Sequence, residues 1–140
     1  MGKISCLLIV GLLAGMMLLT QPTKSVAAET VDLKTSARTF VETLAREDFA
    51  AAVKSFGQPL DSSLPPEELR KTWTMIIAKG GPFVKIAGIE TGRGEEYGGQ
   101  RYDVVLVHCE LAHAKMDVRL SFNRTAQITS LWFVPPEKNN

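Results

Sequence analysis

Cysteine is scarce in this sequence, with Cys6 and Cys109 the only two among 140 residues. Cys6 lies in an apolar N-terminal stretch, so Cys109 is the only cysteine in the rest of the chain. A single cysteine cannot form an internal disulfide, and the fold must therefore be held together by packing alone. No cysteine directly follows the apolar stretch, which argues against lipid attachment of the bacterial lipoprotein kind.

The sequence also lacks an excess of charge of one sign, because 16 basic residues face 15 acidic ones and no basic cluster occurs. Proteins that bind nucleic acid or anionic membrane surfaces usually concentrate positive charge. We therefore expect neither nucleic acid nor a membrane surface as a partner. The sequence contains no catalytic constellation, and we expect no cofactor and no metal.

An apolar run does occupy the N-terminus, and residues 1–28 have the layout of a secretory signal peptide. Lys3 precedes the run ISCLLIVGLLAGMMLLT, which is followed by the polar QPTKS and then VAAET. We predict cleavage after Ala28, with Ala27 as a near alternative, and a secreted or periplasmic location. An uncleaved membrane anchor is the competing interpretation, but the run is shorter than the roughly 20 apolar residues that span a bilayer. No stable membrane insertion is expected after cleavage.

Residues 29–140 are predicted to form a single domain, since no long linker, repeat or low-complexity tract interrupts them. Three helical patterns come first, each with apolar residues at helical spacing. The third begins at LPPEELRKTW and ends at Gly80 and Gly81, where glycine accepts the conformation common past a helix end. The three apolar stripes are Leu33, Ala37, Phe40, Val41 and Leu44; Phe49, Ala52, Val53 and Phe56; and Leu69, Trp73, Ile76 and Ile77.

Strand patterns with a period of two follow, and we place strands near 83–91, 100–111, 115–122 and 126–134. The stretch TGRGEEYGGQ between the first two strands is predicted to be a flexible connection. KMDVRLSF alternates apolar and polar residues, as expected of an antiparallel sheet with one solvated face. Helices followed by strands predict an α+β fold, in which three N-terminal helices pack on one face of a four-stranded antiparallel sheet.

The strand at 100–111 is apolar on both sides. Val105, Val107 and Cys109 share one face, while Val104 and Leu106 make the other face partly apolar. A second covered face indicates either a homodimer through the sheet or a central strand that lies under a loop.

Five segments, in order, resemble an exported family of unknown function, domain of unknown function 3887, in the nuclear transport factor 2-like superfamily. They are FVETLAREDFAAAVKSF, LPPEELRKTW, GPFVKI, VVLVHCEL and AQITSLWFVPP. The resemblance implies helices against a strongly curved sheet, a cystatin-like cone with a pocket at its wide end, and frequent homodimers. Some relatives carry an α/β-hydrolase domain, but this chain has no Gly-x-Ser-x-Gly elbow, so no hydrolase activity is implied.

The stretch VHCELAHAKM, residues 107–116, resembles a metal or cysteine-histidine site. Strand alternation separates its groups, because it places His108 and Glu110 on one face and Cys109 on the other. His113 falls where the chain turns, and its spacing fits zinc geometry only loosely. We therefore predict a solvated hairpin end with no metal, and an unreactive Cys109 in the core.

The set that we single out as a ligand-binding region is Trp73, Asp103 and Trp132, with Tyr97 as a weaker member. Asp103 shares the parity of Val105, so it should point to the helix side of the sheet. A carboxylate at a pocket mouth could act as a general base if burial raised its pKa. The alternative is that both tryptophans belong to the core and that Asp103 makes a hairpin or salt-bridge contact with Arg101 or Arg93.

Three functions are compatible with these residues. The favoured one is a non-enzymatic exported module that binds a small apolar ligand or a protein partner. The second is a small pocket enzyme, of isomerase or hydrolase type, with Asp103 as general base. The third is a structural dimeric accessory protein of the envelope.

Overall fold

The computed structural model describes residues 32–135, so the predicted signal peptide and its cleavage position lie outside the described residues. Helix α1 (Leu33–Ala45) begins at Asp32, whose carboxylate accepts hydrogen bonds from the Lys34 amide at 3.1 Å and the Thr35 hydroxyl at 2.7 Å. The bond from Lys34 satisfies one of the backbone amides that the first helical turn leaves unpaired. The predicted first helix is confirmed, and four of its five stripe residues are buried.

The second predicted helix is a single turn, α2 (Phe49–Ala52), continued by the 3₁₀ helix η1 (Val53–Ser55). A further single turn, α3 (Leu60–Ser63), was not expected from the sequence. The third predicted helix is α4 (Pro66–Gly80), which has proline at its start and ends against Gly81 at a φ of +82°. Glycine adopts that conformation without the steric cost that a side chain imposes.

The sheet has five strands, so the expectation of four was one short. The predicted strands are β1 (Phe83–Thr91), β3 (Gln100–Leu111), β4 (Lys115–Phe122) and β5 (Ile128–Val134). The additional strand, β2 (Glu95–Tyr97), lies in the stretch predicted to be a flexible connection. It pairs with the start of β3 through a two-residue turn, Gly98 and Gly99, whose φ angles of +60° and +73° suit a tight hairpin.

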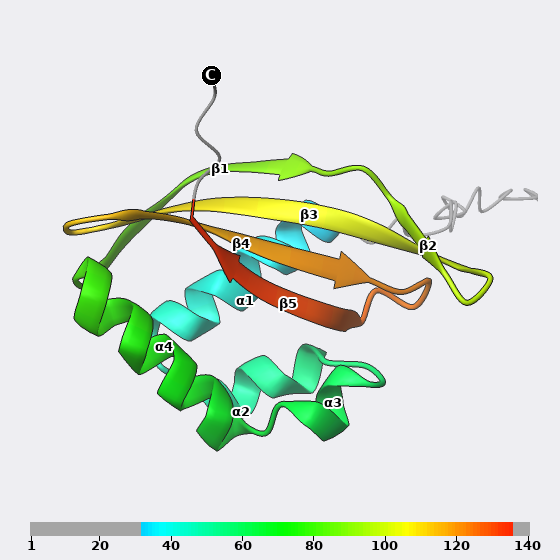
Figure 1. The fold of residues 1–140 in the computed structure, drawn as a ribbon, viewed down its shortest axis with the longest axis horizontal. Helices are drawn as coiled ribbons and strands as arrows, with labels where there is room; N and C mark the ends of the chain where they lie inside the picture. The colour runs from blue at the N-terminus through cyan, green and yellow to red at the C-terminus, as the bar shows by residue number, and fades with distance from the viewer. Residues whose placement is uncertain (1–31, 136–140) are drawn as a thin grey trace, which may run out of the picture.

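The strand order is β1-β3-β4-β5, with all pairs antiparallel, and β2 extends the same edge of β3 that β1 occupies. All helices lie on one side of this long, twisted sheet (Figure 1). We call the helix-covered side the inner face and the opposite side the outer face. The α+β prediction, with helices before an antiparallel sheet, is thus confirmed.

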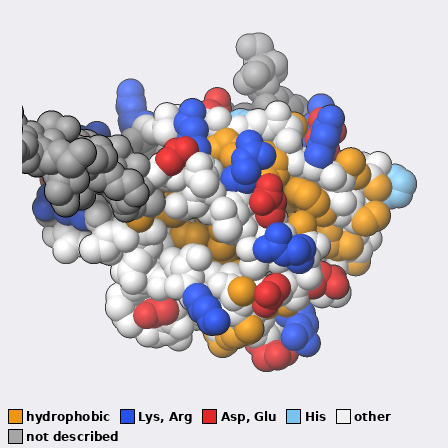
Figure 2. All heavy atoms as spheres, turned by 180° about the vertical axis from the view of Figure 1, so that it is seen from behind, with side chains coloured by type: hydrophobic (Ala, Val, Ile, Leu, Met, Phe, Trp, Pro, Cys, Tyr) orange, Lys and Arg blue, Asp and Glu red, His pale blue; other side chains and the backbone are white. Residues whose placement is uncertain are grey.

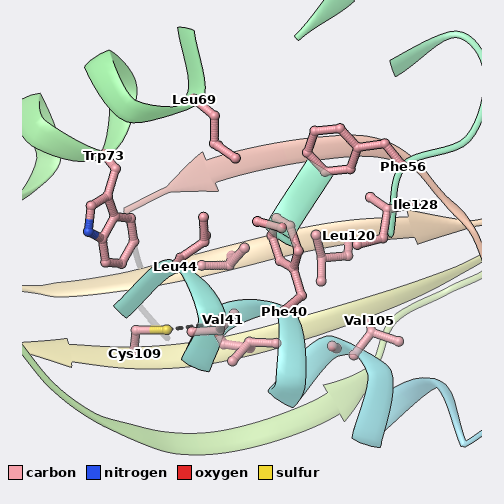
Figure 3. Packing of buried hydrophobic residues seen from close by; sticks show 14 of the residues in the cluster. Phe40, Val41, Leu44, Phe56, Leu69, Trp73, Val105, Cys109, Leu120 and Ile128 are labelled. Carbon is pink, nitrogen blue, oxygen red and sulfur yellow. Dashed lines mark hydrogen bonds between the residues drawn. The ribbon is translucent and has the colours of Figure 1, made fainter. Parts of the chain in front are cut away.

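The core lies between the inner face and the helices. Strand alternation directs Val105, Val107 and Cys109 of β3 inward, opposite Leu120, Val118 and Met116 of β4. Side chains from the helices pack against these residues, with Leu44 of α1 and Trp73 of α4 pointing toward the sheet (Figure 3). Side chains thus occupy the space between the two layers.

The outer face is partly covered at β3. Val104 is only 3% exposed although it points away from the helices. The connection after β1 is close-packed against it, because the Gly92 amide donates to the Val104 carbonyl at 2.8 Å. A β-carbon at Gly92 would lie 3.0 Å from Val104 Cγ1. The residue that follows β1 therefore packs beside Val104.

Candidate functional site: the groove between α4 and β5

The structure does not bring the three predicted ligand-binding residues together. Trp73 is 1% exposed, and its ring packs between those of Phe83 and Phe133 at centroid distances of 6.3 and 6.2 Å. Trp132 lies on the outer face, is 59% exposed, and donates from Nε1 to the Ser130 hydroxyl at 2.8 Å. Asp103 is exposed near the start of β3, opposite Phe122. Tyr97 is exposed on β2.

An open groove of about 390 Å³ runs between α4 and β5, and we call it the α4–β5 groove. Its volume falls in the range of small-molecule sites. Trp132 is the one predicted site residue that lines it, and Trp73 contacts the groove residue Phe133. The lining residues are Leu64, Leu69, Thr72, Met75, Ile76, Lys79, Leu131, Trp132 and Phe133.

Helical and strand periodicity together build this groove. Leu69, Thr72, Ile76 and Lys79 recur on α4 at spacings of three and four residues, which places them along one side of the helix. β5 turns Leu131 toward the helices, opposite Leu120 of β4. Since β5 is the edge strand of the sheet, no further strand among residues 32–135 fills the space beside α4.

The surface of the groove is mostly apolar. Met75, on the α4 wall, is 59% exposed, and Leu64, Ile76 and Leu131 are half-buried. Lys79 is the one charged residue in the lining. Exposed apolar surface that gathers in a hollow marks a binding site more often than scattered apolar residues do.

Charge elsewhere on the molecule is mixed. Figure 2 shows lysine, arginine and acidic side chains interspersed with apolar ones on the side seen from behind. On the outer face, Lys85 pairs with Glu110 at 3.6 Å and Arg119 pairs with Glu95. The described part of the chain therefore presents both signs side by side.

A second polar group on the outer face is built around His108. Its Nδ1 lies 2.7 Å from an Asp117 carboxylate oxygen, and its Nε2 lies 3.2 Å from a Glu90 carboxylate oxygen. The hydrogen bond with Asp117 is the main cause that raises the pKa of the imidazole above its usual value, and Glu90 adds to it. Both ring nitrogens face carboxylates, an arrangement that favours the protonated imidazole over the neutral one.

The remaining members of the VHCELAHAKM stretch lie apart from that group. Glu110 pairs with Lys85, and His113 is exposed between β3 and β4, where its amide donates to the Gly80 carbonyl. Within residues 32–135, no three histidine, cysteine or acidic side chains are grouped to hold a metal ion.

Cys109 is buried on the inner face, where its thiol approaches the Val107 carbonyl (Figure 3). Burial raises the pKa of this thiol to about 12, and the charge of Asp117 contributes in the same direction. A thiol of that pKa is almost entirely protonated at neutral pH and is a poor nucleophile.

The family model of proteins of unknown function (DUF3887) matches residues 37–131, which include most of α1, the other helices and most of the sheet. This chain belongs to that family. The fold is also similar to that of a protein from Ruminococcus gnavus ATCC 29149 solved by NMR, with a TM-score of 0.61 at 19% identity over 71% of this chain and 86% of that chain. No curated protein matches the chain. Among residues 32–135, no helix has the length and apolar character needed to cross a membrane.

Proposed function

We propose that this member of the family is an exported, non-enzymatic binding module that holds an apolar ligand, or an apolar segment of a protein, in the α4–β5 groove. The observation that carries the proposal is the exposed apolar lining, with Met75 and Trp132 each 59% exposed at one hollow. Burying such surface in a complex is favourable by roughly 25 cal/mol for each Å² removed from water.

The filled interior directs the proposal to the surface groove. Helices before an antiparallel sheet support placement in the nuclear transport factor 2-like superfamily, whose cone would offer a pocket between the two layers. In this chain Trp73, Leu69 and Phe40 are among the side chains that fill that space. A ligand would therefore bind beside the layers, at the sheet edge, rather than between them.

The alternative of a small pocket enzyme has less support. Its general base would be Asp103, which is exposed and does not line the α4–β5 groove. An Asp103→Asn variant is expected to bind ligands at the groove as the parent protein does.

The proposed apolar binding at the α4–β5 groove can be tested with N-phenyl-1-naphthylamine, a fluorescent probe that carries no charge. We expect its fluorescence to rise on binding to the purified protein and a Met75→Glu variant to weaken that binding at least about tenfold, because a carboxylate is costly in an apolar contact. Val84→Glu is the matched control, since Val84 is 58% exposed on β1 and outside the groove. Equal binding by both variants would contradict the proposal.

Export is proposed from the N-terminal layout, with the lone Cys109 compatible with an oxidising compartment. Expression of the full chain in a bacterial host is expected to yield an extracytoplasmic protein whose mass lacks residues 1–28. A full-length mass in the membrane fraction would instead support the anchor.

Self-association is proposed at the outer face of β3, where Leu106 is half-buried. Native mass spectrometry is expected to show a dimer that a Leu106→Arg variant loses. A monomeric parent protein would contradict this part of the proposal and would favour self-covering of β3 by its own connection.

A further inference from the structure

The lining of the α4–β5 groove is apolar along most of its length and carries one cation, at one end. Leu69 and Lys79 are ten residues apart on α4, which corresponds to about 15 Å at the rise of an α-helix. Between them Thr72, Met75 and Ile76 contribute a single hydroxyl and no charge. The site therefore has a direction, with an apolar end and a cationic end.

Lys79 differs from the other cations of α4 in having no ion-pair partner among residues 32–135. Arg70 and Lys71 pair with Glu67 and Glu68 in the first two turns of the helix, at 3.9 and 2.7 Å, and none of these four residues lines the groove. Acidic side chains of α4 are thus neutralised at the helix start, far from Lys79. A negative charge near Lys79 would meet an unneutralised ammonium group.

We infer that the groove takes a medium-chain fatty acid, with its hydrocarbon chain along Met75 and Ile76 toward Leu64 and its carboxylate at Lys79. This inference rests on the proposed function and adds the chemical class of the ligand. It follows from the match of an apolar path of about 15 Å with one unpaired cation at its end. The groove volume of about 390 Å³ suits a single chain of this kind.

The β3–β4 hairpin lies against the cationic end of the groove. The amide of His113 donates to the Gly80 carbonyl at 2.8 Å, and a β-carbon at Gly80 would fall 2.4 Å from Leu111 Cδ1. The bond from His113 satisfies one of the carbonyl groups that a helix end leaves unpaired. The last turn of α4, and with it the backbone of Lys79, is therefore fixed in place.

Competition for the bound naphthylamine probe tests the inference with three ligands of equal chain length: laurate, dodecanol and dodecyltrimethylammonium. We expect laurate to displace the probe at a concentration at least about tenfold lower than dodecanol, with dodecyltrimethylammonium the weakest. Lys79→Met should abolish the preference for laurate, and Lys79→Arg should retain it. Lys71→Met, on the same helix but outside the groove, is the matched control and should bind as the parent does.

The two levels of the proposal fail in different ways. Equal displacement by laurate and dodecanol, or a Lys79→Met variant that keeps the laurate preference, would overturn the carboxylate assignment while sensitivity to Met75→Glu still supported an apolar site. If the probe does not bind, laurate is titrated into ¹⁵N-labelled protein. If laurate then shifts no amide signals along α4, or shifts only signals of another surface, both the proposed groove binding and the carboxylate assignment are overturned. Urea unfolding of each variant confirms that it is folded.

Discussion

The two tryptophans of the chain show how differently the two faces of one sheet are used. Trp73 packs on the inner face between two phenylalanine rings and is almost fully removed from solvent. Trp132 lies on the outer face, with most of its ring exposed and its indole N–H bonded to Ser130. The inner face stabilises the fold by apolar packing, whereas the outer face carries ion pairs and leaves an aromatic side chain available at the groove rim.

The largest difference between the faces is expected in chemical access. In a Cys6→Ala chain, native Cys109 should react with dithionitrobenzoate at least about a hundredfold more slowly than the urea-unfolded protein. The reagent reaches Cys109 only when the core around it unfolds, which costs several kcal/mol. The raised pKa of Cys109 also keeps its thiol protonated in the folded protein. A cysteine placed outside, Trp132→Cys in a Cys109→Ala background, should react rapidly. Fast labelling of native Cys109 would contradict burial.

The next largest effect is on stability. Trp73→Ala should lower the free energy of unfolding by about 3–5 kcal/mol, because it leaves a large cavity in the core. Trp132→Ala should change it by no more than about 0.5 kcal/mol, as is usual for surface substitutions. Urea denaturation of both variants measures the difference. Equal losses would mean that Trp132 is packed rather than exposed.

A smaller difference is expected within the outer face itself. Asp117 is buried and bonded to His108, whereas Glu90 is exposed. Asp117→Asn should lower the free energy of unfolding by about 1.5–3 kcal/mol, the range for a hydrogen bond to a charged group. Glu90→Gln should cost less than about 1 kcal/mol. If the two substitutions lower the free energy of unfolding equally, the burial of Asp117 does not strengthen its hydrogen bond to His108.

The smallest effect is the pH dependence of His108. Because its pKa is raised in the folded protein, the stabilisation by its protonated form is complete below about pH 6.5 and is lost as pH rises through the higher folded pKa. Solvent screening at the partly exposed ring should keep this contribution below about 1 kcal/mol. Urea unfolding across this pH range should show the loss in the parent protein and not in His108→Gln. His113→Gln is the control and should behave as the parent does.

Periodicity in the sequence was sufficient for the inner face. The apolar spacing of α1 and α4 and the alternation in β3 and β4 each identified side chains that the structure buries. Strand β2 was missed because Glu95, Glu96 and Tyr97 are all exposed, so the strand has no apolar alternation to detect. Helix α3 is a single turn between prolines, which is too short for a periodic signal.

The candidate site was less accessible to the same reasoning. The alternation of side chains along β3 correctly placed Cys109 and His108 on opposite faces. Alternation predicts the direction of a side chain, but not which other residues cover it. The α4–β5 groove joins Met75 to Leu131, residues far apart in the chain, and its existence depends on β5 being the sheet edge. Strand order is set by tertiary packing, so no local pattern around Lys79 could have identified it as part of a site.

The backbone bridge at the start of β5 has a consequence for solubility. The Gly57 amide donates to the Ile128 carbonyl at 2.9 Å, and a β-carbon at Gly57 would lie 2.8 Å from Gln127 Cβ. Beyond it runs ITSLWFV, rich in the β-branched and aromatic residues from which fibril spines are built. A second chain that paired with this edge of β5 at Ile128 would first have to displace the backbone at Phe56 and Gly57. At one end of this edge strand, protection against strand-by-strand growth therefore rests on a residue that has no side chain.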